Sequence, residues 1–144
     1  MKYLLDTNVV SELAKSTPNP EVVDWVRKLP PRAVYLSVIT IGEIKKGSEK
    51  TGDLQRKAVI EKWLKEDLLV RFDGRILPLG VEEMLEWGAL VATAEKSGRT
   101  LPAVDSLLAA VTRYHGCVLV TRNEKDFEGI GISVINPWTI AASG

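Results

Sequence analysis

The chain has 144 residues, of which 45% are hydrophobic and 26% are charged, values typical of one domain with its own core. Its 19 Lys and Arg residues equal its 19 Asp and Glu residues, which argues against strong nonspecific binding of nucleic acid through net charge. The single cysteine, Cys117, cannot form an internal disulfide, and no apolar run approaches the roughly 20 residues of a membrane span, so we expect one cytoplasmic domain over residues 1–144 with no membrane association.

The first predicted elements are a strand and a helix at the N-terminus. Residues 2–5 form an apolar run that stops at Asp6, and a helix is expected from Asn8 to Lys15. Asp6 therefore lies at the carboxyl end of a strand, the edge where open α/β sheets bind ligands. The alternative is that Asp6 caps the following helix by accepting hydrogen bonds from its free N–H groups. This stretch alone leaves both interpretations open.

The rest of the chain alternates between strand and helix patterns. Strands are expected at residues 34–37, 76–79, 117–121 and 133–135. Helices are expected at residues 21–27, 53–70, 81–97 and 100–114, and a further helix begins near Thr40. Because the strands are apolar without interruption, they favour a mostly parallel sheet of four to five strands covered by helices on both faces. The runs at residues 2–5 and 117–121 are the most apolar and should be the central strands.

Several acids follow the predicted strands in a way that brings them together. Asp6, Glu43, Asp105 and either Asn123 or Asp126 can converge on the carboxyl edge of the sheet. Carboxylates within a few ångströms raise one another's pKa, so such a cluster holds either protons or a divalent cation. Carboxylate oxygens suit Mg²⁺ or Mn²⁺, and such an ion activates water for phosphodiester cleavage.

Other catalytic arrangements are disfavoured. The only histidine, His115, stands at a helix end, where a favourable contact with the helix dipole is expected. Cys117 lies in an apolar strand and should be inert, and neither Ser37 nor Ser106 has a base in a recognisable arrangement. No glycine-rich phosphate loop occurs in the sequence.

Four segments, in order, resemble the four acidic motifs of PIN-domain ribonucleases, and their spacing is similar to that of VapC-type toxins. They are Leu4–Val9, Ser37–Ile44, Pro102–Ala110 and Leu119–Phe127. The resemblance continues to residues 134–138 and so covers nearly the whole chain. It implies a single PIN domain over residues 1–144, with the PIN-like three-layer α/β/α sandwich.

The same resemblance implies an endoribonuclease that depends on Mg²⁺ or Mn²⁺ and acts as the toxin of a toxin–antitoxin pair. Asp6, Glu43 and Asp105 would bind the metal and position the attacking water. The resemblance also implies a homodimer and a small cognate antitoxin that blocks the site.

The fourth motif departs from the pattern of the family. Where many members have an acid, this chain has Asn123, an amide that can hydrogen-bond to water at the metal but brings no charge. We therefore place Asn123 among the expected catalytic residues. Asp126, three residues later, would supply the missing charge as a further metal ligand if the loop turns back.

Two more surfaces are expected around the acids. Lys45, Lys46 and Arg122 would form a basic rim that holds RNA phosphates, the alternative being a solvated helix face. An extended antitoxin segment would place an arginine against the acids and pack its apolar residues in a groove near Val10, Leu13, Val22 and Val26. The alternative for these four residues is the core.

A hypothesis from another class stays open, namely a degenerate PIN-like domain or other α/β interaction module without nuclease activity. A receiver-like domain is disfavoured because Asp6 is followed by Thr7 and not by a second acid, and no lysine follows the last strand. A degenerate nuclease would more often lack one of the three core acids. All three are present, which favours the nuclease.

Overall fold

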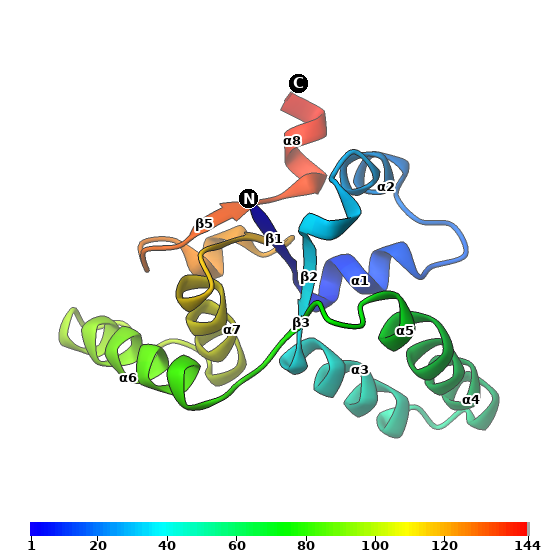
Figure 1. Ribbon diagram of the computed structural model, residues 1–144, viewed down its shortest axis with the longest axis horizontal. Coiled ribbons are helices and arrows are strands. Elements are labelled where there is room, and N and C mark those ends of the chain that lie inside the picture. Colours follow the sequence, from blue (N-terminus) through cyan, green and yellow to red (C-terminus); the bar gives the residue numbers. More distant parts are fainter. Residues whose placement is uncertain (144) are drawn as a thin grey trace.

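The computed structural model describes residues 1–143, with side chains through residue 140. Within them, five strands form one parallel sheet in the order β3-β2-β1-β4-β5 (Figure 1). The strands are β1 (Lys2–Leu5), β2 (Val34–Ser37), β3 (Ile76–Leu77), β4 (Cys117–Val120) and β5 (Ser133–Ile135). The two strands expected at the centre, β1 and β4, are hydrogen-bonded neighbours inside the sheet, which confirms that prediction.

Helices cover both faces of this sheet, as the sequence predicted. They are α1 (Thr7–Leu13), α2 (Pro20–Arg27), α3 (Val38–Lys50), α4 (Leu54–Trp63), α5 (Leu69–Arg71), α6 (Val81–Lys96), α7 (Ala103–Tyr114) and α8 (Pro137–Ser143). Figure 1 shows α6 and α7 on one side of the strands and α1, α3, α4 and α5 on the other. The described chain is therefore a three-layer α/β/α sandwich.

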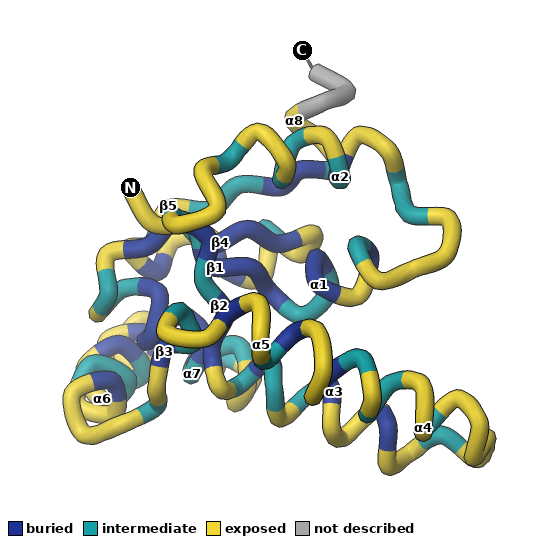
Figure 2. The backbone as a smooth tube through the Cα atoms, turned by 45° about the vertical axis from the view of Figure 1, so that its right-hand side comes forward, coloured by how far each residue is buried: buried dark blue, intermediate teal, exposed yellow. Residues whose placement is uncertain are grey.

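The core is split between the two faces because consecutive strand residues point in opposite directions. Leu4 and Leu119, paired in register, pack with α6 and α7. Leu5 and Val120, paired one residue later, pack with α1, α2 and α3. All four side chains are fully buried, which contributes about 2 kcal/mol of hydrophobic stabilisation each. Figure 2 shows the buried stretches of β1, β2 and β4 near the centre of the domain, with helices that are partly exposed around them.

The helix boundaries follow local chemistry. Asn19, Ser37 and Asp53 accept hydrogen bonds from the first turns of α2, α3 and α4. Gly98, with φ of 81°, follows the C-cap of α6, a conformation that an L side chain rarely adopts. Strand β3, just before Pro78, is an edge strand because it pairs only with β2; a proline has no N–H to donate to a further strand.

Two features differ from the sequence expectations. The helix expected over residues 53–70 is interrupted by a π-helical turn at Leu64–Leu68, before α5. The wider turn keeps Leu64, Leu68 and Phe72, spaced four residues apart, on the buried face. Helix α8 was not expected; the Asn136 side chain begins it by accepting a hydrogen bond from Trp138 N at 2.9 Å. Among the described helices, none combines the length and apolar character needed to cross a bilayer.

Candidate functional site

Asp6 occupies the carboxyl end of β1 and begins α1 at the same time. Its backbone N–H extends the sheet by donating to Val120 O at 2.9 Å. Its Oδ1 accepts from Thr7 N at 2.7 Å, and its Oδ2 accepts from the Thr121 hydroxyl at 2.8 Å. Asp6 is 8% exposed. The two interpretations left open by the sequence are compatible, because one oxygen caps the helix while the carboxylate stays at the sheet edge.

Glu43 reaches the same edge from α3. Its Oε1 accepts a hydrogen bond of 2.5 Å from the Thr7 hydroxyl, which also lies 3.2 Å from the Thr40 hydroxyl. Thr7 has a single hydroxyl proton, and the charged carboxylate is the stronger acceptor. Thr7 therefore ties α1 to α3 and holds Glu43 beside Asp6.

Asp105 and Asp126 add two more acids near Asp6 and Glu43, and neighbouring charges act on Asp6 and Asp105. Burial raises the pKa of Asp6, hydrogen bonds from Thr121 and Thr7 oppose this, and the charges of Glu43 and Asp105 raise it further. Burial likewise raises the pKa of Asp105, with added contributions from the charges of Asp126 and Glu43. Asp105 stands in the first turn of α7, and Asp126 in the 3₁₀ turn η3 (Glu124–Phe127) that follows β4.

Polar residues that the sequence analysis did not single out connect these elements. Asn8 donates from Nδ2 to the Thr121 hydroxyl at 3.2 Å and accepts from Arg122 N at 3.1 Å. The Thr121 hydroxyl also accepts from Asn123 N at 3.1 Å, while the exposed Asn123 begins η3. The buried Asn136 donates to Arg122 O at 3.1 Å. In the sequence, Asn8 and Thr121 could have been found because they lie in the polar stretches that follow the two central strands.

The two expected RNA-binding lysines lie on different sides of α3. Lys45 pairs with Glu49 at 2.8 Å and with Glu61 of α4 at 2.6 Å. Lys46 is exposed and lies almost one turn after Glu43, on the side of the helix that Glu43 shares.

Arg122 and His115 also have defined partners. The guanidinium of Arg122, an exposed residue, lies 5.1 Å from the centre of the Trp138 ring in α8. His115 caps the C-terminus of α7 as expected, and its Nε2 lies 2.8 Å from a carboxylate oxygen of Glu83 in α6. His115 thus belongs to the contact between two helices and not to the acidic group.

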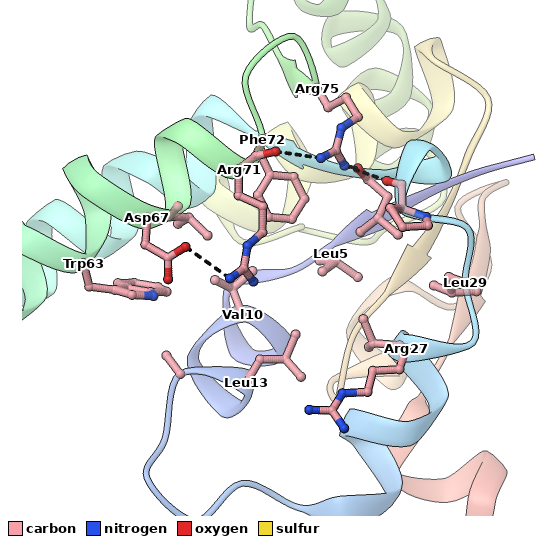
Figure 3. A pocket seen from close by; sticks show the side chains of 15 residues that line it. Leu5, Val10, Leu13, Arg27, Leu29, Trp63, Asp67, Arg71, Phe72 and Arg75 are labelled. Atoms are coloured by element: carbon pink, nitrogen blue, oxygen red, sulfur yellow. Dashed lines mark hydrogen bonds and ion pairs between the residues drawn. The ribbon is translucent and has the colours of Figure 1, made fainter.

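A separate apolar pocket of about 410 Å³ opens between α1, α2 and the helical segment at residues 63–72 (Figure 3). Val10, Leu13 and Val26 line it, as expected for the antitoxin groove. Val22 is instead fully buried in the core, and Val10, although it borders the pocket, is only 3% exposed and belongs to the same core cluster. For these two residues the core alternative is therefore correct. The wall also carries charged side chains, namely Arg27, Arg71, Arg75 and Asp67.

The comparison with known families fits this architecture. The family model described as PIN domain matches residues 3–132. The chain belongs to the PIN-domain family. This result confirms the resemblance drawn from the four acidic motifs.

Two relatives of this PIN domain are similar to it over almost their whole lengths. The VapC ribonuclease Y4jK of Sinorhizobium fredii is 33% identical over 135 residues, covering 94% of this chain and 96% of the relative. Toxin FitB of Neisseria gonorrhoeae is 34% identical over 135 residues, covering 94% and 97%.

Solved structures are similar to this PIN domain in fold as well. The crystal structure of FitAcB from Neisseria gonorrhoeae gives a TM-score of 0.88 at 34% identity, covering 94% of this chain and 98% of that one. A toxin–antitoxin complex from Klebsiella pneumoniae gives a TM-score of 0.66 at 26% identity, covering 94% and 98%.

The acids of this PIN domain are near one another but do not form a preformed metal-binding site. Across the described residues, no three His, Cys, Asp or Glu side chains are grouped closely enough to hold a metal ion as they stand. Hydroxyl groups occupy one oxygen of Asp6 and one of Glu43. A cation bound directly by three of these carboxylates would therefore need them to lie closer together than they do here.

The raised pKa values predict how the stability of the metal-free protein depends on pH. Between the unfolded pKa, ordinarily 3.8, and the higher native pKa of Asp105, the native state binds more protons, so the free energy of unfolding falls as pH rises. Asp105→Asn removes this effect. Urea unfolding from pH 4 to 8 should show the variant gaining stability relative to wild type as pH rises. A constant difference would contradict the assigned burial of Asp105.

Proposed function

We propose that this PIN domain is a metal-dependent endoribonuclease, the toxin of a toxin–antitoxin pair, which hydrolyses phosphodiester bonds in cytoplasmic RNA. The observation that carries the proposal is that Thr7 hydrogen-bonds to both Asp6 and Glu43 at the carboxyl edge of the sheet, at 2.7 and 2.5 Å. The charge of Asp105 acts on Asp6, and the charge of Asp126 acts on Asp105. Membership of the PIN family and similarity to proteins named as a VapC ribonuclease and a toxin support it.

The donor set fits Mg²⁺ or Mn²⁺. Asp6, Glu43, Asp105 and Asp126 offer only hard carboxylate oxygens, and the charges of neighbouring carboxylates raise the pKa of Asp6 and Asp105, an effect that a cation would reverse. When bound, the ion would supply activation of water and charge neutralisation at the phosphate.

The remaining groups of the site would orient this chemistry. Thr121 and Thr7 hold the carboxylates of Asp6 and Glu43 through hydrogen bonds of 2.8 and 2.5 Å. Glu43 and Asp105 would accept hydrogen bonds from the attacking water and so direct it at phosphorus. The exposed amide of Asn123 would donate to a phosphate oxygen or to that water.

The direct test is cleavage of RNA by the purified chain with Mg²⁺ or Mn²⁺ and with a chelator. Cleavage that depends on the added ion is the expected result. Binding of RNA without cleavage under all of these conditions would instead favour the non-enzymatic PIN-like module.

For the substrate we propose that Lys46 and Arg122 hold phosphates on either side of the acids. The ammonium of Lys45 is already shared between two carboxylates, so Lys46, which is exposed beside Glu43, is the better candidate on α3. Arg122 keeps an exposed guanidinium that stacking on Trp138 holds in place.

Charge reversal tests this surface. Lys46→Glu should weaken RNA binding about 10-fold at low salt and flatten its dependence on salt, because fewer counterions are released. Affinity measured across a salt titration gives both quantities, and Mn²⁺ binding should not change. Lys65→Glu, at an exposed lysine in the π-helical turn that follows α4, is the matched control. Equal losses in the two variants would place the RNA elsewhere.

We further propose that the pocket in Figure 3 receives an apolar segment of the antitoxin, while an arginine of the antitoxin reaches the acids. Val10, Leu13 and Val26 offer an apolar floor. A guanidinium can replace a cation between carboxylates because it is always charged and donates in two directions.

We also propose that the protein forms a homodimer through the outer face of α6. Val81 and Leu85, one turn apart, are 76% and 66% exposed. Small residues follow them along the helix at Gly88 and Ala92, where a second backbone can approach closely. Sedimentation velocity reports the oligomeric state directly.

A further inference from the structure

The segment that carries Asp126 borders a hollow that lies between part of it and α6. The segment comprises η3 and the loop through Gly131, in which Gly129 and Gly131 have φ values of 74° and 78°. The hollow, of about 270 Å³, separates Gly129–Gly131 from α6. Arg99 and Arg113 line this hollow. Ile130 of this stretch belongs to the same core cluster as Leu90 of α6, so the side chains that cross the hollow add to a contact that the core already makes.

Arg99 is the side chain that crosses from the α6–α7 connection to this segment. One terminal nitrogen donates to Asp126 O at 3.1 Å, and the other donates to Glu128 O. The backbone of Arg99 is itself fixed, because its N–H donates to Ala94 O at 2.9 Å at the end of α6. A planar guanidinium can hold two carbonyl groups in a set geometry, which a lysine ammonium cannot reproduce.

The second anchor of the segment does not replace this contact. Phe127 and Ile130 are 1% and 9% exposed and pack in the core on the α7 side, which fixes how deep the segment lies. Asp126, one residue earlier, is exposed, and its charge acts on Asp105. The position of its carboxylate follows from the orientation of its own backbone, and Arg99 holds the carbonyl of that residue.

We propose that Arg99 is a positioning residue that holds the Asp126 carboxylate within reach of Asp105 and so completes the cation site. Arg99 does not contact the cation or RNA in this proposal; it acts only through the backbone of η3. The proposal rests on the proposed function of the acids as metal ligands.

The test compares Arg99→Lys with Arg113→Lys. Arg113 lines the same hollow, but its Nε donates to Glu86 of α6 and not to η3. In Arg99→Lys the amides of Asp126 and Glu128, which donate to Asn123 O and Lys125 O, should exchange with solvent at least about 10-fold faster. Calorimetry with Mn²⁺ should show affinity about 10-fold weaker. Arg113→Lys should change neither quantity.

A double variant distinguishes a positioning role of Arg99 from a general loss of structure. If Arg99 acts through the Asp126 carboxylate, Arg99→Lys added to Asp126→Asn should leave Mn²⁺ affinity within about 2-fold of Asp126→Asn alone. A further loss in the double variant, or unchanged amide exchange in Arg99→Lys, would overturn the proposal. Wild-type protein that binds no Mn²⁺ would overturn the metal assignment itself, and amide exchange would still decide whether Arg99 fastens the segment.

Discussion

Asp105→Asn is expected to reduce RNA cleavage at least about 100-fold while leaving the metal-free protein as stable as wild type or slightly more so. The substitution keeps the shape of the side chain and removes one charge from a group of acids in which burial, Asp126 and Glu43 raise the pKa of Asp105. Loss of that repulsion offsets any lost contact. Cleavage rates and urea unfolding, both measured on partner-free protein, give the two results.

Thermal unfolding with and without Mn²⁺ links the loss of activity to the ion. An ion that binds only the folded state raises the melting temperature, so Mn²⁺ should stabilise wild type more than Asp105→Asn. Asp24→Asn, an exposed acid on α2, is the matched control and should behave as wild type in every measurement. Inactivity of Asp105→Asn accompanied by global unfolding would make Asp105 a structural residue.

The parts of the fold that the sequence predicted well are those determined by short stretches. The apolar runs of β1 and β4 contain Leu4, Leu5, Leu119 and Val120, which are fully buried on two different faces. An uninterrupted apolar run is what burial on both faces requires, so the parallel sheet and its central strands followed from local pattern. Asp53 and Gly98 similarly marked a helix start and a helix end through local chemistry.

The features that could not be predicted depend on which segments meet. The hydrogen bond between Thr7 and Glu43 joins residues that are 36 positions apart. Lys45 pairs with Glu61 only because α3 packs on α4. The same holds for Arg99 and the carbonyl of Asp126, 27 positions away. The sequence shows which charged residues can belong to the site. It does not show which of them are already hydrogen-bonded or ion-paired to other residues.

Ala14→Trp is expected to weaken the complex with the antitoxin at least about 100-fold and to leave RNA cleavage unchanged. Ala14 is exposed, lines the pocket and serves as the C-cap of α1 with φ of −86°, a conformation open to any side chain. An indole there would fill space that the partner needs without entering the core. Ala14 follows Asp6 by eight residues, about 12 Å of helix rise, so the acids should be undisturbed.

The measurement is co-purification with the cognate antitoxin and affinity for it. Ala58→Trp is the matched control. It adds the same side chain at an exposed residue of α4 that does not line the pocket. Because the proposed arginine contact at the acids is separate from the pocket, Ala14→Trp should leave a weak complex that salt disrupts more readily than the wild-type complex. Undiminished affinity in Ala14→Trp would mean that the antitoxin covers the acids from another side of the domain.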